Sequence, residues 1–216
     1  MESPLRHPTE PDFRLIETLG YYPERGFARV ELHLDRMARS AQSLDMPFDA
    51  DAAMSCLREA EGDTSLRCRL ALDAGGAFEL TTGVLTPSPA LWRAAIADAH
   101  LEPDDPWLRH KTTRRALYDA ARAALPDGID EWLFLNTKGE FCEGTITNLF
   151  VTKASGEVIT PPLSCGLLPG ILRQEMLAQG RAHEGIVTLD DLHAARLISM
   201  GNSLRGLIRV ELVKSV

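Results

Sequence analysis

The sequence predicts an α+β fold in two lobes, and three observations support this. Apolar or alternating runs pair across short turns as two hairpins; these runs are residues 13–21, 27–32, 66–72 and 78–85. Between the hairpins, apolar residues recur at helical spacing. Thr86-Pro87-Ser88-Pro89 then interrupts the pattern, because two prolines cannot continue a strand ladder. We therefore predict a small N-terminal lobe of residues 1–86 and a larger C-terminal lobe of residues 87–216.

The N-terminal lobe combines these hairpins with two helices. Pro and Gly within residues 23–26 supply the first turn, and Gly75-Gly76 the second. Apolar residues spaced by three, four and three positions predict a helix that ends before Pro47, and they are Leu34, Met37, Ala41 and Leu44. A second helix is predicted over residues 51–61. Residues 1–12 are rich in proline and charge, which predicts an arm outside the fold.

The C-terminal lobe is predicted as strands with interspersed helices. Alternation or short apolar runs indicate strands; they are residues 92–98, 132–135, 146–151 and 158–160. A helical pattern through Ala116 and Ala120 ends at Pro126. Another helix follows Pro169, over residues 170–177, and a third opens at Asp190.

Composition excludes several classes of function. The 216 residues are 44% hydrophobic and 25% charged, as in a globular protein, and the net charge of −8 disfavours binding to nucleic acid or anionic membranes. No run is long and apolar enough to span a bilayer, and no signal sequence is evident. The four cysteines lack metal-ligand spacing and indicate no disulfide framework, so we expect a cytoplasmic protein.

Two isolated residues are candidates for a catalytic site. Lys111 ends a polar loop directly before a helix, and Glu143 stands beside Gly144 where an apolar strand begins. Taken singly, the lysine is typical of a solvated surface charge and the acid of an ordinary strand edge. Asp104-Asp105 and Asp190-Asp191 begin loops or helices, where aspartate caps backbone N–H groups, so they do not predict a metal site.

Four motifs in order resemble the class IV pyridoxal-phosphate enzymes, the group of branched-chain and D-amino acid aminotransferases and 4-amino-4-deoxychorismate lyase. They are His33-Leu34-Asp35-Arg36-Met37, Lys111, the strand from Glu143-Gly144 to Asn148-Leu149-Phe150, and residues 167–173. The resemblance spans about residues 13–210. It implies a two-lobed fold-type IV enzyme like D-amino acid aminotransferase, with an N-terminal α/β sandwich, a C-terminal barrel-like lobe and a shortened N-terminus.

The resemblance also implies how the cofactor, pyridoxal 5′-phosphate (PLP), is bound. Lys111 would hold the cofactor aldehyde and move a proton at the substrate carbon, and Glu143 would keep the pyridine nitrogen protonated. The phosphate would be bound by Arg36 and by the backbone amides of Ile171 and Leu172 at a helix start.

Two further residues follow from the same resemblance. Asn202 or Ser203 stands where the aminotransferases have a phosphate-binding threonine, and either can donate a hydrogen bond.

Two histidines near these motifs have other expected roles. His33 suits packing in the core, and His110 could line the pocket.

The substrate follows from smaller segments. D-amino acid aminotransferases carry an arginine for the substrate carboxylate near the end of the second-hairpin strand, and residues 70–76 here contain none. Four segments of this chain resemble aminodeoxychorismate lyase-like domains; they are residues 16–18, 111–113, 160–170 and 202–206. We therefore favour the lyase that forms 4-aminobenzoate and pyruvate in folate synthesis. An arginine clamp is expected for its dianionic substrate; the first candidate is Arg205, followed by Arg67, Arg69 and Arg109, with Thr18 and Asn148 as further substrate-binding residues.

Two alternatives stay open. One is a class IV aminotransferase acting on branched-chain or other amino acids. The other is a noncatalytic PLP-binding protein whose shortened N-terminus has cost it activity. The resemblance further implies a small-molecule substrate, a homodimer and a functional link to aminodeoxychorismate synthase.

Overall fold

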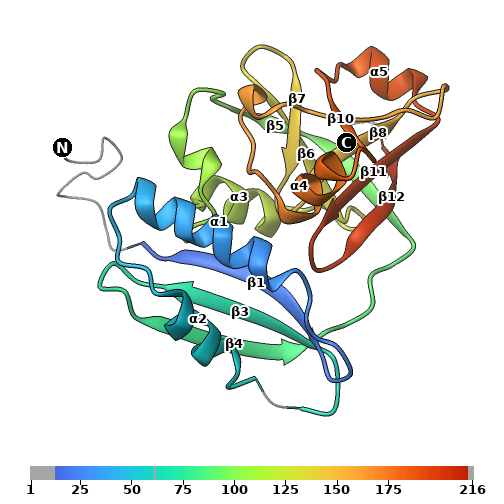
Figure 1. Cartoon of the computed structure of the whole chain (residues 1–216). Coiled ribbons are helices and arrows are strands. Elements are labelled where there is room, and N and C mark those ends of the chain that lie inside the picture. Colours follow the sequence, from blue (N-terminus) through green and yellow to red (C-terminus); the bar gives the residue numbers. More distant parts are fainter. Residues whose placement is uncertain (1–12, 61, 214–216) are drawn as a thin grey trace. The chain divides into compact units, whose positions relative to one another are not determined.

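The computed structural model describes residues 13–60 and 62–213, which form two compact units (Figure 1). The chain leaves the first unit at Thr86–Pro87, but the segment His110–Arg114 belongs to the first unit as well. Lys111 is therefore part of the first unit, which differs from the predicted division at residue 86. The predicted arm of residues 1–12 lies outside the described residues.

The first unit is built on a four-stranded antiparallel sheet in the order β2-β1-β3-β4. Its elements are β1 (Leu15–Tyr22), β2 (Gly26–Phe27), α1 (Val30–Ser43), α2 (Ala50–Leu57), β3 (Leu66–Leu72) and β4 (Phe78–Val84). The hairpin of β3 and β4 is confirmed. The predicted strand 27–32 is wrong beyond Phe27, because Arg29 adopts a left-handed φ of 54° and the helix begins at Val30.

Both helices pack on this sheet. α1 contacts β1, and α2 contacts β3 and β4 (Figure 1). The predicted apolar stripe of α1 is confirmed: it is buried in the core with Leu19, Leu70 and Leu72 of the sheet. Asp49 caps α2 by accepting hydrogen bonds from two backbone amides of its first turn. α2 ends at Leu57, before the predicted residue 61, which lies outside the described residues.

The second unit contains a closed barrel. Its strands are β5 (Leu91–Leu101), β6 (Glu131–Asn136), β7 (Phe141–Gly144), β8 (Asn148–Thr152), β9 (Val158–Thr160), β10 (His183–Glu184), β11 (Leu197–Asn202) and β12 (Gly206–Leu212). They follow the order β10-β9-β8-β11-β12-β5-β6-β7, and β7 pairs back onto β8 through Glu143 and Asn148. Six strands thus close around an apolar core that includes Leu133, Phe141 and Met200, which confirms the barrel-like lobe.

Helices and short turns complete the second unit. They are α3 (Ala116–Ala123), α4 (Ile171–Ala178), α5 (Leu189–Ala194) and the 3₁₀ turns η1 (Pro106–Arg109) and η2 (Leu163–Cys165). Thr188 and Asp191 cap α5 reciprocally, so Asp191 of the acidic pair caps the helix start as expected. β7, β10, β11 and β12 were absent from the sequence-based prediction. Among the described residues, no helix combines the length and apolar character that crossing a bilayer would require.

Candidate active site

Lys111 lies on a segment that extends the sheet of the first unit. Its carbonyl accepts a hydrogen bond from the amide of Ile16 at 2.9 Å, and Thr112 pairs with Leu15 as an antiparallel bridge. The amide of Thr113 donates to the carbonyl of Arg14, also at 2.9 Å. β2 pairs with β1 only at Tyr21 and Tyr22. The Lys111 segment therefore lies on the same edge of β1, at the end that begins with Leu15. The backbone of Lys111 is therefore fixed by β1.

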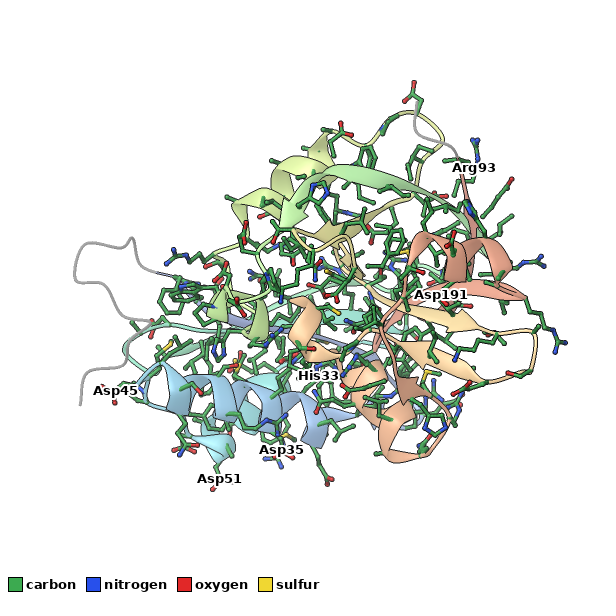
Figure 2. All side chains as sticks on the ribbon, turned by 90° about the horizontal axis from the view of Figure 1, so that it is seen from above. His33, Asp35, Asp45, Asp51, Arg93 and Asp191 are labelled. Carbon is green, nitrogen blue, oxygen red and sulfur yellow. The ribbon has the colours of Figure 1, made fainter. Side chains whose placement is uncertain are left out.

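Next to this segment, α1 presents a buried polar stripe beside its apolar one. His33, Arg36 and Ser40 share this face and are 1%, 4% and 5% exposed, whereas Asp35 lies on the exposed side of the helix (Figure 2). The Oγ of Ser40 lies 3.0 Å from Nδ1 of His110, the residue before Lys111. The hydrogen bond to Ser40 orients His110, which had been a candidate for pocket lining.

Glu17 on β1 is the centre of this polar stripe and was missed by the sequence analysis. Its Oε1 accepts from Nε of Arg36 at 2.8 Å, and its Oε2 accepts from Nη2 of Arg36 and Nδ1 of His33, both at 2.6 Å. The side chain is 1% exposed. A single acid within an otherwise apolar strand, Leu15-Ile16-Glu17, is the signal that could have revealed it.

We expect Glu17 to make the stability of the protein sensitive to acid. Burial raises its pKa, but the charge of Arg36 and the hydrogen bond from His33 outweigh burial and hold the pKa at about 2, below the ordinary 4.5. Because the folded-state pKa is depressed, Glu17 stabilises the fold above its ordinary value and loses that contribution as pH falls toward 2. Urea unfolding across this range should show a loss of up to about 3 kcal/mol that Glu17→Gln lacks. An identical pH slope in the variant would contradict this.

Thr18 follows Glu17 on β1 and is half-buried, opposite Arg69 of β3. Arg67 lies two residues earlier on β3 and is exposed. Of the four candidate arginines for the substrate carboxylate, only Arg67 and Arg69 belong to the first unit. The structure thus brings Thr18 and Arg69 together.

In the second unit, Glu143 lies where β7 meets β8 and is 6% exposed. Its Oε1 accepts from the hydroxyl of Tyr118 at 2.7 Å, and its Oε2 accepts from Nδ2 of Asn148 at 3.3 Å and from the amide of Leu168 at 3.2 Å. These three donors are uncharged. Burial and the negative charge of Glu143 raise the pKa of Tyr118, so this phenol stays protonated and keeps donating. A buried carboxylate held in this way suits a cationic N–H group of a ligand.

Asn148 links Glu143 to the start of α4. Besides donating to Glu143, its Nδ2 donates to the carbonyl of Leu168 at 3.0 Å. Gly170 packs so closely on this side chain that a Cβ there would lie 1.9 Å from Oδ1 of Asn148. These contacts show Asn148, a candidate substrate-binding residue, holding Glu143 and the Leu168–Gly170 loop in place.

The first turn of α4 offers backbone donors. The N-cap Gly170 has no side chain to satisfy them, and the first N–H groups of a helix have no acceptor within the helix itself. Ile171 and Leu172 open this turn and are 2% and 5% exposed. Amides at such a position and the positive end of a helix dipole are chemically suited to an anion such as a phosphate.

Glu131 organises the turn between β7 and β8 and was also missed. It is fully buried and accepts hydrogen bonds from the amides of Thr145 and Ile146 and from the hydroxyls of Thr145 and Thr147. Nη1 of Arg122 lies 3.5 Å from Oε1 of Glu131 and also donates to Thr145. The signal that could have revealed it is again an acid at the start of an apolar strand.

Replacing Glu131 by alanine should destabilise the second unit strongly. Several buried donors of the 145–147 turn would lose their acceptor, and we expect the free energy of unfolding to fall by about 3 to 5 kcal/mol. Urea denaturation measures this loss. Glu157→Ala, which removes an exposed acid, serves as the control and should cost less than about 1 kcal/mol. Equal stability of the two variants would contradict the role of Glu131.

Asn202, Ser203 and Arg205 lie at the turn between β11 and β12. Oδ1 of Asn202 accepts from the amides of Leu204 and Arg205, and its Nδ2 donates to the carbonyl of Ile146 at 3.1 Å. Asn202 thereby joins this turn to the 145–147 turn. The guanidinium of Arg205 lies 5.7 Å from the ring centroid of Trp92.

Arg109, the last of the candidate arginines, lies in η1 of the second unit. Its Nη1 donates to the carbonyl of Leu167 at 3.0 Å, and Nη2 donates to that of Pro103 at 3.4 Å. These bonds show Arg109 holding the loop that leads to Leu168, whose amide in turn donates to Glu143.

A closed six-stranded barrel with a buried carboxylate and a helix start for an anion, together with a sheet unit that carries the lysine, defines a fold-type IV enzyme. The family model for amino-transferase class IV matches residues 14–213. The chain belongs to this family, and the fold class predicted from the sequence is confirmed.

Three relatives illustrate the similarity. A Mesorhizobium loti protein, provisionally named an amino-acid aminotransferase, is 42% identical with a TM-score of 0.90, over 94% of this chain and 100% of that one. A Schizosaccharomyces pombe protein, provisionally named an aminodeoxychorismate lyase, is 31% identical over 80% of this chain and 79% of its own length. A Mycobacterium tuberculosis protein named a hypothetical aminotransferase, solved in a PLP-bound form, is 22% identical with a TM-score of 0.79, over 96% of this chain and 87% of that one; it shows the fold alone.

Proposed function

We propose that the chain is a PLP-dependent lyase that converts 4-amino-4-deoxychorismate to 4-aminobenzoate and pyruvate. The observation that carries the choice of reaction is the turn between β3 and β4. There Oδ1 of Asp73 accepts hydrogen bonds from the amides of Gly75 and Ala77, both at 2.9 Å. The stretch 70–76, in which D-amino acid aminotransferases carry an arginine for the substrate carboxylate, contains no arginine here, and an acid holds its turn. Similarity to the S. pombe protein over most of both chains supports the same choice.

The residues present fit PLP as the cofactor. Glu143 is a buried acceptor suited to a protonated pyridine nitrogen, and the α4 start is suited to a phosphate. Lys111 has a backbone fixed by β1 and a side chain that is partly exposed, as a residue that exchanges ligands needs to be. Each donor or acceptor matches one functional group of the cofactor.

Within this proposal each residue has a defined task. Lys111 would hold the aldehyde carbon and, as a free amine, remove the proton from the substrate carbon that bears the amino group. Glu143 would keep the ring nitrogen protonated, held in place by Tyr118 and Asn148. PLP, when bound, supplies an electron sink for the carbanion. Loss of the enolpyruvyl group as pyruvate then leaves an aromatic ring, which drives the reaction forward.

The substrate carries two carboxylates, and we propose cationic and hydroxyl groups of the chain to bind them. Arg205 is the first candidate, in the turn after β11. In the first unit, Thr18 and Arg69 lie opposite each other on neighbouring strands and form a second donor pair.

The experiment purifies the protein with PLP and looks for the yellow colour of lysine-bound cofactor. Enzymatically made 4-amino-4-deoxychorismate is then added, 4-aminobenzoate is measured by chromatography, and pyruvate by a coupled dehydrogenase. Equal amounts of both products support the lyase. Bound cofactor without turnover of any substrate would instead support the noncatalytic alternative, and the absence of bound cofactor would overturn the whole proposal.

A class IV aminotransferase is the second candidate. The 42% identity to the M. loti protein favours it. Amino donors such as the branched-chain amino acids distinguish this candidate from the lyase. A transaminase converts the bound cofactor to its amine form when a donor is added, and it releases no pyruvate from the lyase substrate. Absorbance of the holoenzyme after addition of each donor separates the two.

A further inference from the structure

The buried acid Glu17 has no task in the proposed chemistry, although burying a carboxylate is costly. Its contacts with Arg36 form a two-pronged pair: Nε meets Oε1 at 2.8 Å and Nη2 meets Oε2 at 2.6 Å. His33 holds Oε2 from a third direction, through Nδ1 at 2.6 Å. All three residues are less than 5% exposed.

This geometry fixes the orientation of Arg36. A paired contact through Nε and Nη2 aligns the planes of guanidinium and carboxylate, so the Nη1 edge of Arg36 faces away from Glu17. An arginine side chain is long and rotates freely unless it is held. Since His33 also clamps Glu17, the acid itself is not free to turn.

Stability alone does not account for this arrangement. A buried ion pair is often no more stabilising than apolar side chains of similar volume. A fixed guanidinium edge is useful when it must meet a planar or trigonal anion, and phosphate is such an anion.

We propose that Glu17 is a positioning residue that aims Arg36 at the phosphate of PLP, with His33 holding Glu17. This inference rests on the proposed function, since it concerns the same cofactor. It adds a residue pair that acts on phosphate recognition without touching the cofactor.

The test measures binding to cofactor-free protein rather than turnover. The protein is titrated with PLP, with pyridoxal, which lacks the phosphate, and with inorganic phosphate. We expect Glu17→Gln to raise the Kd for PLP and for inorganic phosphate by roughly tenfold to a hundredfold, as losing an orienting partner does. The Kd for pyridoxal should stay unchanged. Asp35→Asn removes one negative charge from the exposed side of α1 and serves as the matched control, with all three Kd values unchanged.

A second variant covers the case in which Glu17→Gln does not fold. Glu17→Asp keeps the charge but shortens the side chain, so it should weaken PLP binding selectively as well. In an Arg36→Gln background it should have no further effect, because Glu17 acts through Arg36.

The outcomes are distinct. Equal weakening of PLP and pyridoxal binding would mean a structural role, and unchanged PLP binding in both Glu17 variants would mean no role; either result overturns the inference alone. A wild-type protein that binds none of the three ligands overturns the proposed function and this inference together.

Discussion

Lys111→Ala should abolish both the yellow colour of the protein incubated with PLP and its catalytic activity. The lysine amine is the only group proposed to hold the cofactor aldehyde and to move the proton at the substrate carbon, so one substitution removes a covalent and an acid–base function. We expect activity to fall by about 10⁴-fold or more. Absorbance spectra and product assays at saturating PLP measure the two losses separately.

Lys138→Ala is the matched control for this prediction. Lys138 lies exposed in the turn between β6 and β7, and its replacement removes the same charge and the same side chain from the surface. It should keep colour and activity. A yellow, active Lys111→Ala protein would show that another amine holds the cofactor, and the assignment of the catalytic lysine would fail.

Glu143→Gln should leave the fold intact and reduce turnover by about 10²- to 10³-fold. The carboxamide has nearly the shape of the carboxylate, and its oxygen can still accept from Asn148 and from the amide of Leu168. Its NH2 group then donates to the hydroxyl oxygen of Tyr118, which lies 2.7 Å from the carboxylate in the wild type. The carboxamide carries no charge, however, and so does not favour protonation of the pyridine nitrogen. The measurements are kcat with saturating substrate and the thermal unfolding midpoint.

The control for this prediction is Glu157→Gln, which makes the same replacement of a carboxylate oxygen by an NH2 group at an exposed acid in the same unit. Both variants should unfold at nearly the wild-type temperature, and only Glu143→Gln should lose turnover. A Glu143→Gln enzyme that turns over at the wild-type rate would remove Glu143 from the cofactor site.

Elements with a clear period were predictable from the sequence. The alternation in residues 66–72 predicted β3 and its hairpin with β4, and the apolar stripe through Leu34 and Met37 predicted α1. β12 alternates buried Ile208 and Val210 with exposed neighbours, a period of two that was present in the sequence and overlooked. By contrast, the four residues of β7, Phe141-Cys142-Glu143-Gly144, are all buried although one is charged, and so short a segment has no period that separates strand from helix.

The residues of the candidate site likewise include some that the sequence predicted and some that it did not. The resemblance to the family supplied Lys111, Glu143 and the start of α4, because these residues occur in short motifs. Glu17, Tyr118 and Glu131 were missed because their importance depends on burial and on partners far away in sequence. Glu17, for example, pairs with Arg36, nineteen positions later. Such long-range pairs leave no local pattern.

The placement of residues 110–114 in the first unit has a consequence for the order of folding during synthesis. On the edge that faces away from β3, the Leu15 end of β1 pairs with residues 111–113: the amide of Ile16 donates to the carbonyl of Lys111, and Thr112 forms a bridge with Leu15. The ribosome adds these residues after β5 and η1 of the second unit. The N-terminal sheet is therefore incomplete when residue 86 emerges, and domain-by-domain folding from the N-terminus cannot finish it. Until the lysine segment arrives, the edge of β1 is exposed to other strands, a known route to aggregation. The same five residues that carry the proposed catalytic lysine thus also complete the nascent sheet.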